Sequence, residues 1–297
     1  MGNLRALVKD AARSPAALLF GAAYVLALVS ASREAPGQAL VYVALSGGIL
    51  LLIWFVVDLT RKTQVATVEI KRPYLELGFA LLVILVSCFA PLPKLQFGGK
   101  WDLGQVLLKL ILLFALPVAF LRLRGNSLSS MGFSLLNWKH NLKVGGIVLA
   151  CLAVPTALFV GDTASLIFSG KLGVSQALLA YPALFVHNLA LSGLTEEVFY
   201  RAFIQTRLSQ VLGSRLAGVL ITSLVFGLVH VPCIRQWYPD ITLLGAFARA
   251  FFMQGFMGLL LGVLWQRTHN LIPGMIVHSG INALTALGSL AVLTVLP

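Results

Sequence analysis

Two adjacent carboxylates and an arginine stand at the end of an apolar segment, in the stretch Thr195-Glu196-Glu197-Val198-Phe199-Tyr200-Arg201. Apolar residues 180–194 lead directly into it, and it is the only place where two of the chain's 10 acidic residues fall within an apolar span. A charge at bilayer depth costs at least ~2.5–3.5 kcal/mol on insertion scales, so an ionisable residue there is by default a functional-site hypothesis. The pair is therefore a candidate for acid–base chemistry.

Helical spacing gives the two glutamates different surroundings. Glu197 and Arg201 are four residues apart and share a helix face, which predicts an internal ion pair. Glu196 is turned about 100° away and has no helical cation of its own. A desolvated carboxylate without a cation has a raised proton affinity, which favours a general base. The structural alternative for Glu196 is a hydrogen bond between helices.

Two later apolar segments carry further polar side chains. His230 ends the run Phe226-Gly227-Leu228-Val229-His230, and His278 and Asn282 lie four residues apart in the last apolar run. The i,i+4 spacing places His278 and Asn282 on one helix face. Taken alone, His230 could be a residue at the membrane interface. His278 and Asn282 could form hydrogen bonds between helices.

Composition identifies an integral membrane protein. The chain is 59% hydrophobic and 11% charged, whereas soluble domains carry about 25% charge. Runs long enough to span a bilayer, about 20 residues each, predict an all-α, polytopic transmembrane helix bundle of eight or nine helices. A transmembrane barrel is disfavoured because no segments of ~10 alternating residues occur. The runs lie at 16–32, 39–59, 75–92, 104–121, 144–160, 177–206, 213–233, 243–266 and 271–295.

The net charge of +12 reflects membrane topology rather than nucleic-acid binding. Basic residues concentrate in alternate connections, the positive-inside pattern. This pattern predicts a multi-pass protein of the cell's inner or plasma membrane with a cytoplasmic N-terminus, and anionic lipids as counterions. The residues that set the predicted cytoplasmic side are Arg5, Lys9, Arg13, Arg61, Lys62, Lys71, Arg72, Arg122, Arg124, Lys139, Lys143, Arg207, Arg215 and Arg267.

The polar constellation is confined to the C-terminal part of the chain. We therefore expect one integral membrane domain, 1–297, with scaffold spans in 1–176 and a chemical core in 177–297. Lys109, near one end of a leading span, is expected to snorkel toward the membrane surface. Arg249 lies inside a later span, and the sequence identifies no partner for it.

Neither a metal nor another cofactor is expected from the sequence. Cys88, Cys151 and Cys233 are widely spaced, with no CxxC pair. The chain also lacks an HExxH segment, the local signature of many zinc peptidases.

The motifs Glu196-Glu197-x-x-x-Arg201, Phe226-x-x-x-His230 and His278-x-x-x-Asn282, in this order, resemble those of the CPBP family. This is the CAAX-protease and bacteriocin-processing family, also called Abi, and it includes the type II CAAX prenyl endopeptidase. The resemblance covers roughly residues 178–287, and nothing is transferred onto the leading spans.

The resemblance implies a glutamic intramembrane endopeptidase that acts on a membrane-anchored or lipidated protein or peptide. By matching position, Glu196 would be the base that activates water, and His230 would hold or polarise that water. His278 and Asn282 would stabilise the oxyanion, while Glu197 and Arg201 would hold the site together. Amide hydrolysis needs such a base, a positioned water and donors for the developing charge.

Three other functions stay open at this point. A zinc-dependent metallopeptidase could use a glutamate and the two histidines from separate helices. A non-proteolytic scaffold or chaperone could use the same fold and polar cluster to bind a partner. A transporter could use the ionisable groups as a proton pathway.

Overall fold

The structure is a computed structural model that describes residues 14–61, 63, 70, 72–89, 96–97, 101–160 and 163–294. Its chain divides into two units. Unit 1 comprises residues 1–57, 66–90 and 200–267; unit 2 comprises residues 58–65, 91–199 and 268–297. Some of the basic residues that carry the topology prediction lie outside the described residues, namely Arg5, Lys9, Arg13, Lys62 and Lys71.

Helices build unit 1. Proline stands at the first position of its first three helices, where the missing N–H costs nothing, and the side chain of Ser14 caps the first of them by accepting from Ala17 N. The helices are α2 (Pro15–Glu34), α3 (Pro36–Leu59), α4 (Pro73–Phe89), α10 (Thr206–Val211), α11 (Arg215–Leu228), α12 (Val231–Trp237), α13 (Leu243–Ala250), the π-helix η6 (Phe251–Gly255) and α14 (Phe256–Thr268).

Unit 2 is also helical, apart from two short strands, β1 (Gln96–Phe97) and β2 (Trp101–Asp102), which pair antiparallel. Its helices are α5 (Leu103–Lys109), η1 (Leu110–Ala115), α6 (Leu116–Leu123), η2 (Ser129–Met131), α7 (Trp138–Pro155), η3 (Thr156–Val160), α8 (Thr163–Phe168), α9 (Val174–Asn188), η4 (Leu189–Leu194) and α15 (Leu271–Thr294). The π-helix η5 (Glu197–Gln205) contains the boundary between the units.

The prediction of an all-α polytopic bundle is confirmed. Among the described residues, 8 helices are long and apolar enough to cross a membrane, and Pro73–Cys88 forms a shorter apolar helix. These nine elements correspond to the nine predicted runs. The main difference is the sixth run, predicted at 177–206, which is a continuous helical segment of 38 residues, Val174–Val211.

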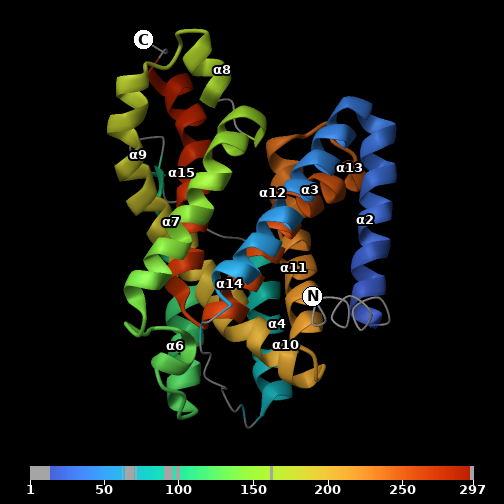
Figure 1. Ribbon diagram of the computed structural model, residues 1–297, viewed down its shortest axis with the longest axis vertical. Coiled ribbons are helices and arrows are strands. Elements are labelled where there is room, and N and C mark those ends of the chain that lie inside the picture. Colours follow the sequence, from blue (N-terminus) through green and yellow to red (C-terminus); the bar gives the residue numbers. More distant parts are fainter. Residues whose placement is uncertain are drawn as a thin grey trace. The chain divides into compact units, whose positions relative to one another are not determined.

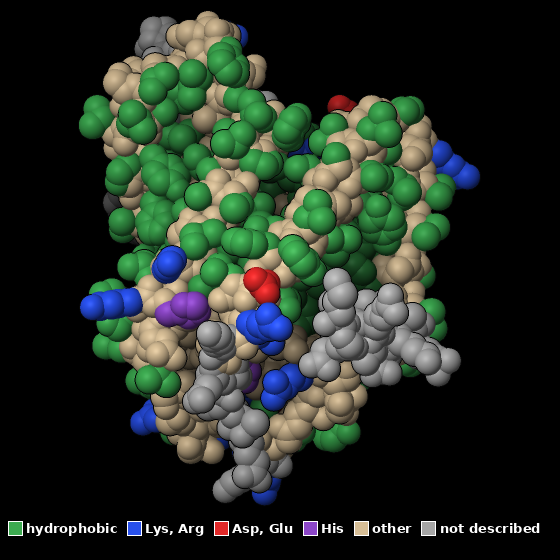
Figure 2. Space-filling model, viewed as in Figure 1, with side chains coloured by type: hydrophobic (Ala, Val, Ile, Leu, Met, Phe, Trp, Pro, Cys, Tyr) green, Lys and Arg blue, Asp and Glu red, His purple; other side chains and the backbone are tan. Residues whose placement is uncertain are grey.

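Large apolar side chains stay exposed on these helices, as membrane-spanning helices require. Leu51 is 73% exposed, Val154 64% and Leu179 81%. Figure 2 shows hydrophobic side chains spread over the visible helices. A soluble protein rarely exposes such extended apolar surface, so these faces contact lipid.

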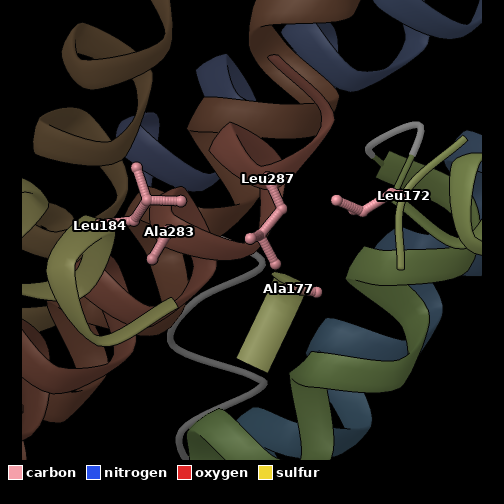
Figure 3. Packing of buried hydrophobic residues seen from close by; sticks show 5 residues of the cluster. All are labelled: Leu172, Ala177, Leu184, Ala283 and Leu287. Carbon is pink, nitrogen blue, oxygen red and sulfur yellow. The ribbon is translucent and has the colours of Figure 1, made fainter. Parts of the chain in front are cut away.

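The core of unit 2 is organised around α15, which packs against α7 and α9 (Figure 1). Figure 3 shows the apolar cluster at the α9–α15 contact, made of Leu172, Ala177, Leu184, Ala283 and Leu287. Gly145 of α7 lets α15 approach closely, since a Cβ there would lie 3.0 Å from the Cα of Pro273. Small residues at a helix crossing are the usual means of close packing in membranes.

In unit 1, aromatic side chains fill the contact of α2 and α3 with η6. Tyr42 stacks on Phe252 with ring centroids 4.9 Å apart, and Phe20 contacts Phe251 at 5.1 Å. A buried ion pair joins α4 to α10, with Arg207 Nε donating to Glu76 Oε2 at 2.8 Å. Unit 1 therefore combines an aromatic core with an internal charge pair that sequence analysis did not identify.

Candidate active site

The glutamate pair lies in a helix that is widened on both sides. The π-helix η4 ends at Leu194, Thr195 and Glu196 follow, and η5 begins at Glu197. π-Helical turns form i→i+5 hydrogen bonds and occur frequently at functional sites. The predicted α-helical spacing is therefore wrong here. Glu197 and Arg201 belong to different units, and their predicted ion pair stays a prediction.

Glu196 has a cation partner that sequence analysis missed. Its side chain is buried, and Lys109 Nζ lies 2.5 Å from its Oε1. The expectation that Glu196 lacks a cation is wrong, because the partner lies 87 residues away rather than on the same helix. The expectation that Lys109 snorkels outward is wrong for the same reason: its ammonium turns inward to the carboxylate.

His278 lies beside both glutamates. Its Nδ1 forms a 2.9 Å hydrogen bond with Glu197 Oε1, and its Nε2 is 3.8 Å from Glu196 Oε2. The first distance is a good hydrogen bond, whereas the second exceeds hydrogen-bond range. With Nδ1 bonded to Glu197, Nε2 is the ring nitrogen that faces Glu196. The carboxylate of Glu197 thus orients the imidazole, as second-sphere carboxylates orient histidines in other sites.

Glycines allow the helices that carry these side chains to approach closely. A Cβ on Gly274 of α15 would lie 2.7 Å from Glu197 Oε2. A Cβ on Gly193 of η4 would collide with Ser279 Oγ and lie 3.0 Å from the carbonyl oxygen of Met275. The η4–α15 crossing therefore brings the glutamates to His278 only because both helices present glycine there.

Asn282 lies one α-helical turn after His278 on α15, as the sequence predicts. Its side chain is half-buried, and its backbone carbonyl accepts a hydrogen bond from Thr285 Oγ1 at 3.0 Å. The structure thus places Glu196, Glu197, His278 and Asn282 in unit 2 and draws the first three together.

Arg201 and His230 lie in unit 1, where Phe226 contacts both. The Arg201 guanidinium carbon is 4.9 Å from the centre of the Phe226 ring, and the His230 ring packs edge-to-face on it at 4.8 Å. Arg201 and Phe226 are almost completely buried. The Phe226 ring therefore packs against both the arginine and the histidine of the motifs.

The span that carries His230 is broken at that residue. Helix α11 ends at Leu228 and α12 begins at Val231, so His230 occupies the turn between them. Its Nδ1 lies 2.6 Å from the carbonyl oxygen of Phe226. A carbonyl only accepts, so Nδ1 carries the proton and Nε2 the lone pair.

The structure shows a partner for Arg249, which the sequence did not identify. Its guanidinium donates to the Tyr238 hydroxyl at 2.9 Å and lies 4.4 Å from the centre of that ring. An aromatic face with a hydroxyl satisfies an arginine without a carboxylate. Arg249 is therefore explained by packing within unit 1.

Among the residues that the structure describes, no group of three or more His, Cys, Asp or Glu side chains has the geometry of a metal site. Metal-independent chemistry stays a prediction.

Comparison with known proteins gives one family. Residues 178–284, about a third of the chain, match the family model described as Rce1-like, type II CAAX prenyl endopeptidase Rce1-like. The matched segment contains all seven named residues of the three motifs, and the resemblance stated from the sequence is confirmed. No curated protein and no solved structure matches the chain.

Proposed function

We propose that this chain, whose residues 178–284 match the Rce1-like family model, is an intramembrane endopeptidase in which Glu196 activates water. Its substrate is a membrane-anchored or lipidated protein or peptide, cleaved by CAAX-type or related processing. The family match supports the reaction class, and an integral multi-pass membrane protein is the setting that this reaction requires. The glutamate mechanism is our inference from the site.

The observation that carries the mechanism is the arrangement of the two glutamates around His278. Glu196 Oε2 and His278 Nε2 are 3.8 Å apart, and Glu197 fixes the imidazole from its other side. A separation beyond hydrogen-bond length suits a water that contacts both groups. The water attacks the scissile carbonyl, and Glu196 takes a proton from the water as it attacks.

The remaining motif residues are assigned complementary roles. As the family resemblance implies, His230 holds or polarises the attacking water, and Asn282 and His278 stabilise the oxyanion. Arg201 and Glu197 support the site structurally. The scissile nitrogen then accepts the proton held by Glu196 and leaves as the amine when the C–N bond breaks, so the base of the first step is the acid of the second.

The test is peptide cleavage by the purified protein in liposomes. The probe is a quenched fluorescent peptide that ends in a prenylated CAAX sequence, compared with the same peptide without the prenyl group. We expect cleavage of the prenylated peptide within the CAAX sequence, identified by mass spectrometry of the products. If neither peptide is cleaved, the proposed CAAX-type activity is contradicted.

The same assay separates the glutamate mechanism from the zinc-dependent alternative. We expect unchanged activity after prolonged chelation and buffer exchange, with substoichiometric zinc by elemental analysis. Activity that chelation removes and only zinc restores would favour the metallopeptidase. A cellular phenotype that survives Ala substitution of Glu196, His230, His278 and Asn282 together would favour the non-proteolytic scaffold.

A further inference from the structure

Lys109 occupies a position that the proposed reaction does not explain. It ends α5, directly before the π-helix η1, and both elements pack against η4, which precedes the glutamate pair. Its side chain is 35% exposed, whereas that of Glu196 is 5% exposed. A half-exposed lysine in an apolar span would ordinarily extend its ammonium toward water. Here the ammonium turns inward.

The ion pair divides the two oxygens of Glu196 between two neighbours. Lys109 Nζ lies 2.5 Å from Oε1, while Oε2 is the oxygen nearest to His278 Nε2, at 3.8 Å. A carboxylate that accepts a charge-assisted hydrogen bond on one oxygen is fixed in rotation, so its other oxygen has a defined direction. That direction is toward the imidazole.

Burial makes the charge of Lys109 important for Glu196. A buried carboxylate is penalised in its ionised form, and a nearby cation offsets the penalty. A general base must be ionised before it can accept a proton from water. Both effects of Lys109, the charge and the fixed direction, therefore act on the oxygen that would take the proton.

We propose that Lys109 is a positioning residue for the base: its ammonium keeps Glu196 ionised and holds Oε1 so that Oε2 faces His278. The inference rests on the proposed function, in which Glu196 is the base. Lys109 lies outside the matched family segment, so it is a contribution of the leading spans of this chain.

The first test is kinetic. Lys109→Met should lower kcat by roughly 10–100-fold, the range for loss of a residue that orients a site ligand, with little change in KM. Lys109→Arg should recover most of the rate because it keeps the cation. Lys143→Met, an exposed lysine of α7, is the matched control and should be unaffected. Full activity of Lys109→Met would overturn the proposal.

A chemical rescue guards against a variant that merely misfolds. In a background without Cys88, Cys151 and Cys233, Lys109→Cys should be slow, and alkylation with 2-bromoethylamine should restore the rate by rebuilding an ammonium. Alkylation with iodoacetamide, which adds a neutral amide, should not restore it. Equal rates after the two reagents would contradict a role of the charge.

A spectroscopic test does not depend on turnover. The infrared difference between Lys109→Met and the wild-type protein should contain the stretch of a newly protonated carboxylic acid, and this band should vanish when Glu196→Gln is added. Its absence would overturn the proposal even if the enzyme is active. If the band appears while Glu196→Gln cleaves normally, the proposed function fails and the ionising role of Lys109 stands.

Discussion

At the scale of single residues, three ion pairs of the described residues join buried side chains to defined partners. Lys109 meets Glu196, His278 meets Glu197, and Arg207 meets Glu76. Removing one member of such a pair leaves an uncompensated buried charge, which is usually strongly destabilising. Loss of a pair is expected to have different effects, because the first two pairs belong to the candidate site in unit 2, whereas the third lies in unit 1.

The Arg207–Glu76 pair predicts a stability defect. Both side chains are at most 3% exposed, so Glu76→Gln should destabilise the protein by about 3–5 kcal/mol. The matched control is Asp58→Asn, which removes the exposed partner of Arg61 and should cost about 0–1 kcal/mol. Thermal unfolding in detergent measures both. Equal melting temperatures for the two variants would show that the buried pair contributes no more than a surface pair.

At the scale of elements, most of the fold could be predicted from the sequence. Among the described residues, apolar runs located the 8 helices that are long and apolar enough to cross a membrane and the shorter apolar helix Pro73–Cys88, because length and composition determine a span. The π-helical turns around the glutamates could not be predicted, because their extra residue has no signature in hydrophobicity. The Lys109–Glu196 and His278–Glu197 contacts join residues more than 80 positions apart, and helical periodicity carries no information on such pairs.

One signal in the sequence could have pointed to Lys109. It is a lysine set within an otherwise apolar span, and an intramembrane charge calls for a named partner. Glu196 is a carboxylate in an apolar span, and helical spacing alone gives it no cation partner. Matching an unexplained cation to an unexplained carboxylate would have given the pair, although nothing in the sequence sets its geometry.

The η4–α15 crossing predicts an activity defect from one added methyl group. Gly274→Ala places a Cβ 2.7 Å from Glu197 Oε2, so the carboxylate must shift and its hydrogen bond with His278 is disturbed. We expect kcat to fall by roughly 10–100-fold, with stability nearly unchanged because Ala is the better helix former. Gly146→Ala is the control, since nothing lies within 4 Å of its added Cβ. Full activity of Gly274→Ala would show that the Glu197–His278 contact is dispensable.

At the scale of the whole molecule, the distribution of basic residues predicts the topology. The connection between α6 and α7 contains Arg124 and follows Arg122, whereas that between α8 and α9 contains only Lys171. Ser127 and Ser169 are both exposed. In a cysteine-free background, the single variants Ser127→Cys and Ser169→Cys should therefore be labelled from opposite sides of the membrane. An impermeant maleimide should modify Ser127→Cys only from the cytoplasmic side. Labelling of both from one side would contradict the predicted orientation.

The most direct measurement of the central claim compares Glu196→Gln with the wild-type protein in cleavage of the prenylated quenched peptide. The substitution removes the base while keeping the shape of the side chain, and the expected loss in kcat is ~10²–10⁴-fold. Asp240→Asn, which changes an exposed carboxylate of unit 1, should cleave at the wild-type rate. Loss of cleavage in Glu196→Gln alone, with both variants folded, is the predicted result. Cleavage by Glu196→Gln at the wild-type rate would contradict the glutamate mechanism.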